Sequence, residues 1–299
     1  IVDGIRGEVL IDPEQETVAE YIQRRMDFEK ERAALEKYMG LETLTKDGEK
    51  VQLFANIGTP EDASQVIAYD GEGVGLFRTE FLFMDRSTMP DENEQFEAYK
   101  KALLIMKNKT VIIRTLDIGG DKEIPYLGLK KEENPFLGFR AVRYCLKNSE
   151  MFKTQLRALL RASAYGDLQI MIPLVTGVDE LRQVKALIRE IQAELDEKVI
   201  AYNKDIKVGV MIETPSAAIL ADVLAKEADF FSIGTNDLTG YTMAVDRGNA
   251  NVAYLYSAFS PAVLRMLRHI LSEGKKAGIP VGMCGEAAAD PLLIPLLIS

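Results

Sequence analysis

Residues 73–78, GVGLFR, form a short apolar run that ends on an arginine, and similar runs recur along the chain. Short apolar runs that alternate with helical stretches are typical of repeated βαβ units and a parallel sheet. We expect seven strands, at VQLFANI (51–57), GVGLFR (73–78), TVIIRTLD (110–117), LQIMIPL (168–174), KVGVMIE (207–213), FFSIGT (230–235) and PVGMCG (280–285).

Helical patterns fill the spaces between these runs, at residues 92–106, 138–163, 178–197, 216–227 and 261–277. This order favours an α/β fold, a (β/α)₈ TIM barrel, although periodicity alone leaves an open sheet possible. An eighth strand is missing, because the sequence ends inside PLLIPLLIS, which has the pattern of a helix start. We expect residues 46–299 to form a barrel that lacks its last strand.

The first 45 residues have a different pattern and predict a linker helix. Asp12-Pro13-Glu14 is typical of a helix start, and Gly40 of a helix end, so we expect a half-exposed helix to about Met39. Asp47-Gly48 predicts a tight hairpin turn. The sequence starts with Ile1 rather than methionine, so we expect a processed product or a piece of something longer.

The composition is that of a globular protein, with 299 residues, 47% hydrophobic and 27% charged. The 36 basic and 46 acidic side chains give a net charge of −10, which argues against a nucleic-acid partner. No apolar run approaches the roughly 18 residues of a membrane span, and no secretory leader precedes the first helix. The two cysteines make no metal or redox motif. We therefore expect a cytoplasmic protein without membrane insertion.

Polar residues stand where the predicted strands end, which is where a parallel barrel carries its active site. They are Arg78, Arg114, Glu213, Asn236, Asp237 and Cys284.

The arginines at two strand ends predict a site for an anionic small molecule, because a guanidinium matches phosphate and carboxylate oxygens two at a time. Arg247, ten residues beyond Asp237, could supply a third. Glu213 and Asp237 suit Mg²⁺, which takes its remaining ligands from water and substrate phosphate. The alternative is that the arginines are surface ion-pair partners and that these carboxylates only neutralise them.

Cys284 lies between Met283 and Gly285, and a thiol that is protonated at neutral pH can donate a proton. The other cysteine, Cys145, fits an inert buried position. His269, the only histidine, lies between leucines of an amphipathic helix and fits its surface. If the chemistry is phosphoryl transfer through a histidine, the acceptor lies outside this sequence.

Several strings together carry a family resemblance over nearly the whole chain from about residue 50. They resemble the phosphoenolpyruvate (PEP)-utilising enzymes, and RTEFLFM together with RTLDIGGDKE is most similar to Enzyme I of the bacterial sugar phosphotransferase system. The strings are GVGLFRTEFLFM (73–84), RTLDIGGDKE (114–123), ENPFLGFR (133–140), GVMIETPSA (209–217), FFSIGTNDLTGYTMAVDRGN (230–249) and GMCGE (282–286).

The resemblance implies roles for the residues that match the family's motifs. Arg78 and Arg114 match catalytic arginines that hold the phosphate, and Arg247 and Asn236 match residues that reach phosphate or carboxylate oxygens. Arg140 matches a further arginine of the substrate site.

Other matches concern the metal and the proton. Glu213 and Asp237 match Mg²⁺ ligands, and Asp237 also belongs to the substrate-binding set. Cys284 matches the proton donor to the methylene carbon of enolpyruvate. Lys122, in the same motif as Arg114, is a further candidate for substrate binding.

The resemblance implies a phosphotransferase with a nitrogenous acceptor. It would bind PEP with Mg²⁺, donate the phosphoryl group to a histidine on a separate domain and release pyruvate, as the first step of sugar transport. The implied partners are the phosphohistidine domain of the same full-length enzyme, the histidine phosphocarrier protein and a second copy in a homodimer. Residues 1–45 would then be the linker from the phosphohistidine domain.

The sequence departs from the family pattern in three ways. The phosphohistidine domain with its Thr-Ser-His motif is absent, the barrel lacks its last strand, and Ala289 and Gly240 replace the usual glycine and glutamine. Two alternatives stay open: the PEP-binding half of a pyruvate phosphate dikinase or PEP synthase, although no ATP-binding motif occurs here, and a domain that serves mainly as a dimerisation scaffold.

Overall fold

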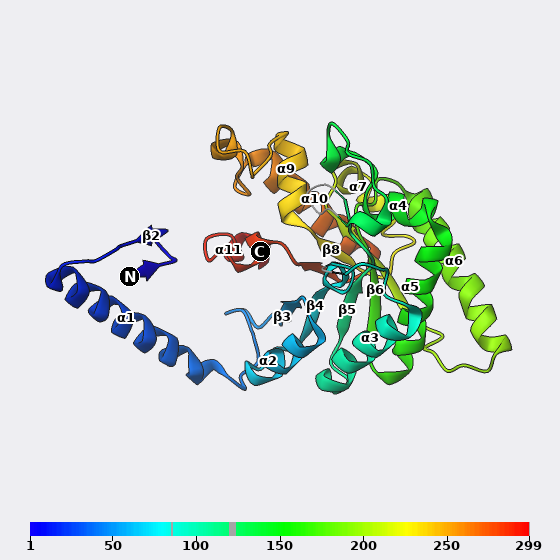
Figure 1. Cartoon of the computed structure of the whole chain (residues 1–299), viewed down its shortest axis with the longest axis horizontal. Helices are drawn as coiled ribbons and strands as arrows, with labels where there is room; N and C mark the ends of the chain where they lie inside the picture. Colours follow the sequence, from blue (N-terminus) through cyan, green and yellow to red (C-terminus); the bar gives the residue numbers. More distant parts are fainter. Residues whose placement is uncertain (85, 120–123, 299) are drawn as a thin grey trace. The chain divides into compact units, whose positions relative to one another are not determined.

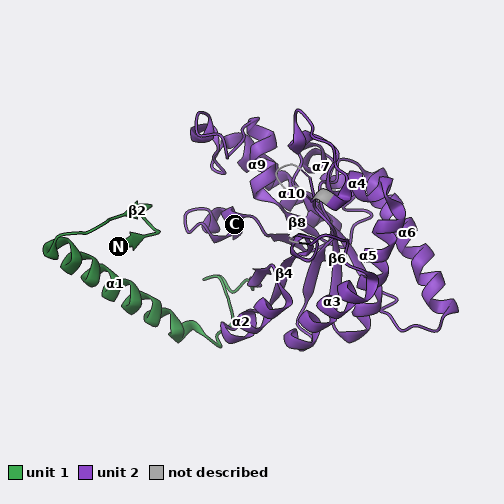
Figure 2. Ribbon diagram, viewed as in Figure 1, with its two compact units in different colours: residues 1–50 green, residues 51–299 purple. Residues whose placement is uncertain are grey.

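The computed structural model describes residues 1–84, 86–119 and 124–298. The chain divides into two compact units, residues 1–50 and residues 51–299 (Figure 2). The fold of each unit follows from a different local pattern.

The first unit consists of an antiparallel pair, β1 (Val2–Asp3) and β2 (Glu8–Val9), and helix α1 (Gln15–Leu35) with the 3₁₀ turn η1 (Glu36–Tyr38). The expected half-exposed helix is wrong in detail, because none of the residues of α1 is buried. The helix also begins later than predicted, since Asp12 has a left-handed φ of 49°. The turn predicted at Asp47-Gly48 is confirmed by an antiparallel bridge between Leu44 and Lys50.

The second unit is built on a parallel sheet whose strand order follows the order of the chain. In a doubly wound sheet the strand order reverses at a switch point, so this topology is that of a (β/α) barrel. The predicted α/β barrel fold is therefore confirmed. Among the described residues, this sheet has seven strands, β3 (Phe54–Ile57), β4 (Gly73–Arg78), β5 (Val111–Arg114), β6 (Leu168–Ile172), β7 (Lys207–Ile212), β8 (Phe231–Ile233) and β9 (Val281–Met283).

Helices lie outside the strands and cover one face of this sheet (Figure 1). The helices of this outer layer are α2 (Ala63–Ala68), α3 (Glu92–Met106), α5 (Ser149–Ala162), α6 (Val178–Glu197), α7 (Pro215–Ile219), α8 (Ala221–Leu224) and α10 (Pro261–Ala277). The described chain also contains α4 (Ala141–Lys147), α9 (Thr235–Met243) and α11 (Ile294–Ile298). Short 3₁₀ turns connect them, at η2 (Pro60–Asp62), η3 (Thr79–Leu82), η4 (Pro125–Leu127), η5 (Pro135–Leu137), η6 (Ser163–Tyr165), η7 (Ala253–Leu255) and η8 (Glu286–Ala289). Within the described ranges, no helix has both the length and the apolar character needed to cross a membrane.

Two helices predicted as continuous are each divided in the structure. The stretch 138–163 contains α4 and α5, which are separated at Asn148 with φ −108° and ψ 58°. The Asn148 amide donates to the Tyr144 carbonyl at 2.9 Å, a local bond of the kind that competes with helix continuation. The stretch 216–227 is divided at Leu220 into α7 and α8.

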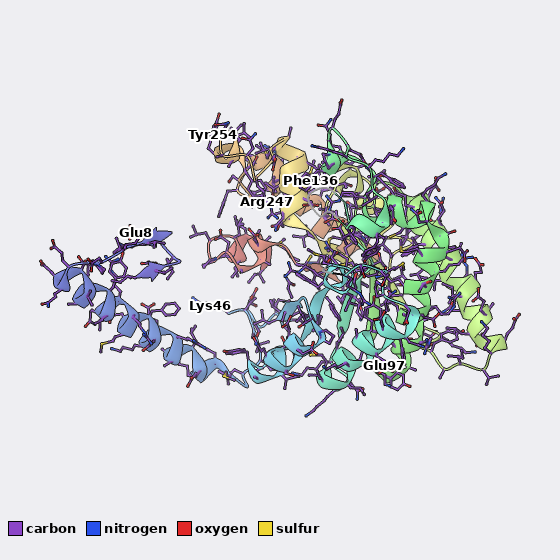
Figure 3. The ribbon with its side chains drawn as sticks, viewed as in Figure 1. Glu8, Lys46, Glu97, Phe136, Arg247 and Tyr254 are labelled. Carbon is purple, nitrogen blue, oxygen red and sulfur yellow. The ribbon has the colours of Figure 1, made fainter. Side chains whose placement is uncertain are left out.

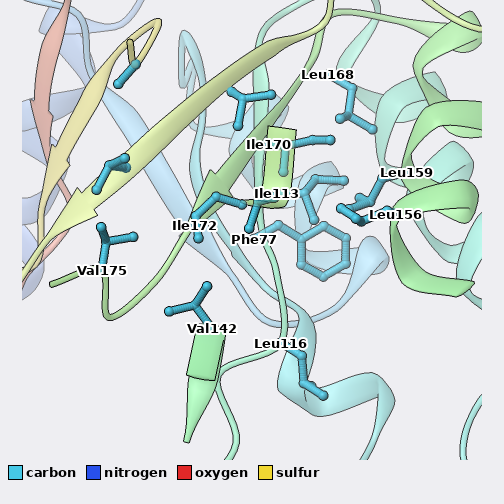
Figure 4. Packing of buried hydrophobic residues seen from close by; sticks show 14 of the residues in the cluster. Phe77, Ile113, Leu116, Val142, Leu156, Leu159, Leu168, Ile170, Ile172 and Val175 are labelled. Carbon is cyan, nitrogen blue, oxygen red and sulfur yellow. The ribbon is translucent and has the colours of Figure 1, made fainter. Parts of the chain in front are cut away.

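The main core lies between the sheet and the helices. Phe77, Ile113 and Ile170 point outward from three strands and pack in one cluster with Leu156 and Leu159 of α5 (Figure 4). Each of these side chains is fully buried. Burial of a large apolar side chain contributes roughly 1.5–3 kcal/mol, so this cluster is the main stabilising feature of the sheet.

A second, smaller cluster lies on the other face of the sheet and fills the inside of its curve. It contains Leu76, Met171, Met211 and Phe230, with Ile112 and Cys284 packed against it. Because successive side chains of a strand alternate between faces, residues two positions beyond these point to the same inner face. The inner face is therefore apolar in the middle of the strands and carries polar and charged side chains at their carboxyl ends.

Candidate functional site

Strand register brings the predicted site residues to one edge of the sheet. Arg78 on β4 is the register partner of Arg114 on β5. Ile212, Ile233 and Met283 are aligned on β7, β8 and β9. The next residues on these strands, Glu213, Gly234 and Cys284, therefore form one layer at the carboxyl edge, which is where a barrel builds its site.

A buried charge network occupies this edge. Arg114 forms ion pairs through Nη2 with Glu80 Oε1 at 2.7 Å and through Nη1 with Asp117 Oδ2 at 3.0 Å. Arg140 binds the other oxygen of Asp117 at 2.8 Å and approaches Asp237 Oδ2 at 3.4 Å. We call these five residues the buried charge network, in which positive and negative groups alternate; Asp237, with 26% of its side chain exposed, is its outermost member.

The protonation of the two network arginines is fixed by their neighbours. Burial by itself lowers the pKa of Arg114, but the carboxylates of Glu80, Asp117 and Glu213 outweigh it and the net shift is upward. The pKa of Arg140 is also raised: burial lowers it, and Asp117 and Asp237 more than compensate. Both side chains therefore remain cationic and carry charge-assisted bonds, which are stronger than neutral ones.

A close backbone contact positions Arg140. Gly119 has a φ of 122°, and a Cβ built on it would lie 2.4 Å from the Arg140 Cβ. A side chain at this position is therefore excluded both by conformation and by space. Gly119, the first glycine of DIGG, therefore allows the loop after β5 to pass directly beneath Arg140.

Glu213 lies at the end of β7 and is almost completely buried, with 3% of its surface exposed. Its Oε1 accepts a hydrogen bond from the Leu174 backbone N–H at 2.6 Å. Burial, and then the nearby charges of Asp237 and Asp117, raise the pKa of Glu213 to about 8. Gly234 makes room for this carboxylate, since a Cβ there would lie 2.8 Å from Glu213 Oε2.

These carboxylates fit a divalent cation. The negative charge of Asp237 destabilises the charged form of Glu213, and a bound cation would remove that repulsion. In the described ranges, no group of three or more His, Cys, Asp or Glu side chains is placed to hold a metal. A pair of carboxylates suits Mg²⁺, which keeps waters and shares substrate oxygens, better than Ca²⁺, which needs more protein ligands.

Cys284 follows β9 and is partly buried beside the inner apolar cluster. Burial is the main reason that the pKa of its thiol is raised, so the group is protonated at neutral pH. Its sulfur lies 3.7 Å from the Ile233 carbonyl. The Asn56 amide donates to the Cys284 backbone carbonyl at 2.9 Å, and so connects the edge strands β3 and β9 beside the thiol.

The remaining predicted residues form a second, more exposed set. Arg247, with 54% of its side chain exposed, pairs with Glu286 Oε1 at 3.2 Å, and Asn236 Nδ2 donates to the same oxygen at 3.2 Å. Arg78 is exposed, and its guanidinium carbon lies 5.4 Å from the centre of the Phe81 ring. We call Arg78, Asn236, Arg247 and Glu286 the exposed rim; Figure 3 labels Arg247 beside α9.

Two residues of this edge were missed by the sequence interpretation. Glu80 is a charged residue just beyond the carboxyl end of β4, and this position is the signal that could have identified it. The second missed residue is Asn56, a polar residue near the end of the apolar run VQLFANI (51–57). Lys122 lies outside the described residues. His269 lies on α10, with its Nε2 at 3.4 Å from the Ile219 carbonyl, on the outer helical layer as expected.

The chain matches known proteins over its whole length. It is 53% identical over 298 residues to a phosphoenolpyruvate-protein phosphotransferase of Priestia megaterium, which covers all of this chain and 52% of that protein. It is 54% identical over 299 residues to the protein of the same name from Geobacillus stearothermophilus, again with 100% and 52% coverage. The chain thus spans about half the length of the curated relatives it matches.

Comparison with solved structures supports the fold. An aldolase/citrate lyase family protein from Burkholderia cenocepacia J2315 aligns with a TM-score of 0.50 and 14% sequence identity, over 82% of this chain and 85% of that one. A family model described as PEP-utilising enzyme, PEP-binding domain, matches residues 32–299. The chain therefore belongs to the PEP-utilising enzymes and carries their PEP-binding domain.

Proposed function

We propose that this chain binds PEP together with Mg²⁺ and donates the phosphoryl group to a histidine on a separate domain, releasing pyruvate. The observation that carries the proposal is the convergence, at one sheet edge, of Arg114, Arg140, Asp237 and Glu213 with a protonated thiol. The names of the relatives, phosphoenolpyruvate-protein phosphotransferases, favour this function over that of a dikinase or synthase.

In this proposal the arginines bind and orient the anionic substrate. Phosphoryl transfer requires positioning and charge neutralisation more than covalent chemistry by the protein. Arg114 is already oriented by its two carboxylate partners, whereas Arg78 and Arg247 stand at the rim and would close on the phosphate and carboxylate oxygens. Asn236 and Arg140 would supply further donors to the same oxygens.

Glu213 and Asp237 are the residues that would hold Mg²⁺. When bound, the ion would supply positive charge that offsets the negative charge developing during transfer. Glu213 is fixed by the Leu174 N–H, and its second oxygen lies against Gly234. The carboxylate would therefore be held in one orientation toward the cation.

Cys284 would deliver the proton that completes the reaction. Once the phosphoryl group leaves, enolpyruvate needs a proton at its methylene carbon, and a general acid must be protonated beforehand. The raised pKa of the Cys284 thiol meets this requirement. The adjacent apolar side chains, including Met211 and Phe230, would exclude water from the enol.

The acceptor must come from elsewhere, because the only histidine of this chain lies on α10 and contacts the Ile219 carbonyl. We propose a phosphohistidine domain of the same full-length enzyme, and through it the histidine phosphocarrier protein, as partners in the cytoplasm. We also propose a homodimer. Exposed apolar side chains near η7, such as Tyr254 at 79% exposure and Phe259 at 41%, support such a contact.

Calorimetric titration tests this function. PEP is added to the folded chain with Mg²⁺ and, in a parallel sample, with a chelator. We expect binding that requires Mg²⁺ and that disappears in the Asp237→Asn variant. A folded sample that shows no magnesium-dependent binding of PEP would contradict the proposal.

A further inference from the structure

Glu80 has no part in the proposed chemistry, yet it is one of the most deeply buried charged groups of the molecule. It lies in η3, directly after β4, and only 1% of its surface is exposed. It forms an ion pair with Arg114, which follows Ile112 of the inner cluster by two positions on β5 and so points to the inner face of the sheet. A buried carboxylate at this point requires a physical explanation.

The contacts of Glu80 are unevenly divided between its two oxygens. Oε1 accepts from Arg114 Nη2 at 2.7 Å and from the Asp117 backbone N–H at 3.2 Å. Oε2 is buried and has no hydrogen-bond partner among the described residues. All the bonds that this carboxylate forms in the described chain are therefore directed to Arg114 and to the loop behind it.

Such an arrangement is unfavourable for stability alone. Desolvation of a carboxylate costs several kcal/mol, and the attraction of an ion pair offsets this only when the remaining oxygens are also satisfied. Apolar residues of similar volume are often as stabilising as a buried pair, or more so. An unsatisfied buried oxygen next to a candidate substrate site therefore points to a role in that site.

The backbone around Arg114 has supports other than Glu80. The Thr79 hydroxyl donates to the Arg114 carbonyl at 2.9 Å. Gln155 of α5 accepts from the Leu116 N–H at 3.0 Å and donates to the Thr79 hydroxyl at 3.3 Å. This second set of buried bonds fixes the ends of β4 and β5 from the outer face. Beyond this set, Glu80 adds one bond to the Asp117 N–H and the ion pair that holds the guanidinium of Arg114.

We propose that Glu80 is a positioning residue for Arg114. By holding Nη2, while Asp117 holds Nη1, it fixes the plane of the guanidinium and directs the remaining N–H groups toward the phosphoryl oxygens of the substrate. A guanidinium fixed in advance loses less freedom when it binds its anion, and so binds it more tightly. This inference rests on the proposed binding of PEP and names a residue that controls it.

The Glu80→Gln variant tests this role, because the amide keeps the shape and one acceptor oxygen but removes the charge. Calorimetry with Mg²⁺ compares PEP with pyruvate, which lacks the phosphoryl group. We expect PEP to bind about 10-fold more weakly and pyruvate to bind as in the unmodified chain. Nitrogen-15 NMR of arginine side chains should show faster rotation of the Arg114 guanidinium.

Glu92→Gln is the matched control. Glu92 also pairs with arginines, at 2.5 Å from Arg161 and 3.3 Å from Arg157, but it lies on the helical layer. Its substitution should leave the affinities for both ligands unchanged.

Two outcomes would overturn the role of Glu80: unchanged affinity for PEP, or equal weakening of PEP and pyruvate with a lower unfolding temperature. Absence of PEP binding in the unmodified chain would instead reject the proposed function. If Glu80→Gln does not fold, Glu80→Asp, which keeps the charge and withdraws it by one methylene, takes its place. It should fold and still bind PEP several-fold more weakly, and full affinity would overturn the inference.

Discussion

Arg78 and Arg114 are register partners on neighbouring strands, yet they lie in contrasting surroundings. Arg114 is buried between Glu80 and Asp117, whereas Arg78 is exposed above the ring of Phe81. The same contrast separates the buried charge network from the exposed rim. If the proposed site is correct, one half of it is formed in advance by the fold and the other half is left free to respond to a ligand.

The two arginines differ in exposure because the chain takes a different path after each strand. After β5 the chain continues inward, and Asp117 is held by both Arg114 and Arg140. After β4 the η3 turn places Phe81 on the surface, with 48% of its area exposed. A buried ion pair is rigid because its separation would leave an unpaired charge in the interior, and an exposed side chain has no such penalty.

The largest expected effect is the loss of stability in Arg114→Ala. This substitution leaves Glu80 buried without its cation and Asp117 with Arg140 alone, so we expect the free energy of unfolding to fall by about 3–5 kcal/mol. Arg78→Ala removes an exposed cation–π contact with Phe81 and the electrostatic attraction to Asp62, and should cost less than about 1 kcal/mol. Urea denaturation of both variants measures the difference. Equal losses would show that the two arginines are energetically alike and would remove the contrast.

The second prediction concerns the affinity for PEP. Arg78→Ala should weaken binding without changing the stability of the fold. A charge-assisted hydrogen bond contributes about 1.5–3 kcal/mol, so we expect PEP to bind roughly 10- to 100-fold more weakly with Mg²⁺ present. The unfolding temperature should stay unchanged. Arg189→Ala, an exposed arginine of α6, is the control and should retain full affinity. Unaltered binding in Arg78→Ala would exclude this residue from the site.

A third test concerns the charge of Glu213. Its pKa is about 8 in the folded chain and 4.5 in the reference state. Between these values the folded chain holds a proton that the unfolded chain has released, so stability falls as pH rises. Without Mg²⁺, Glu213→Gln should therefore unfold at a temperature a few degrees above the unmodified chain at pH 8, with a smaller gap at pH 5.5.

Thermal unfolding in the presence of a chelator gives this comparison directly. Glu197→Gln, an exposed residue at the end of α6, should show no gap that depends on pH. A stability of the unmodified chain that increases between pH 5.5 and pH 8, relative to Glu213→Gln, would mean that the buried carboxylate is charged without a metal.

Local sequence patterns were sufficient for the regular elements of the barrel. The bounds of β4, α3, α6 and α10 agree with the predictions to the residue, because each combines clear apolar periodicity with a recognisable start or end. For example, α10 begins with Pro261 and ends before Gly278, which has a φ of 71°. Proline at the first position and glycine just after the last are common start and stop signals of a helix.

Patterns failed where long-range contacts decide the local structure. The third predicted strand ends at Arg114 instead of residue 117, because the Asp117 N–H bonds to Glu80 rather than to a neighbouring strand. The rim and the buried network could not be distinguished in advance, since nothing near Arg78 or Arg114 in the sequence shows which one is enclosed. Arg140 was identified only through the resemblance, because its partner Asp117 lies 23 positions earlier.

The smallest effect, and the most discriminating, is expected for Glu286→Gln at the rim. Glu286 holds both Arg247 and Asn236 through one oxygen, but 79% of its side chain is exposed, so the ion pair contributes at most about 1 kcal/mol. Stability should hardly change. Affinity for PEP should rise two- to three-fold, since an anionic ligand no longer competes with the carboxylate for the guanidinium.

The matched change in the buried network is Asp117→Asn, which also removes a carboxylate from an arginine. Here we expect the stability to fall, because Arg114 and Arg140 would face each other in the interior with less compensating negative charge. Calorimetry measures the affinity of both variants for PEP, and urea denaturation measures their stability. If Glu286→Gln weakened binding and Asp117→Asn did not reduce stability, the rim would be the part formed in advance, and the contrast between Arg78 and Arg114 would need the reverse explanation.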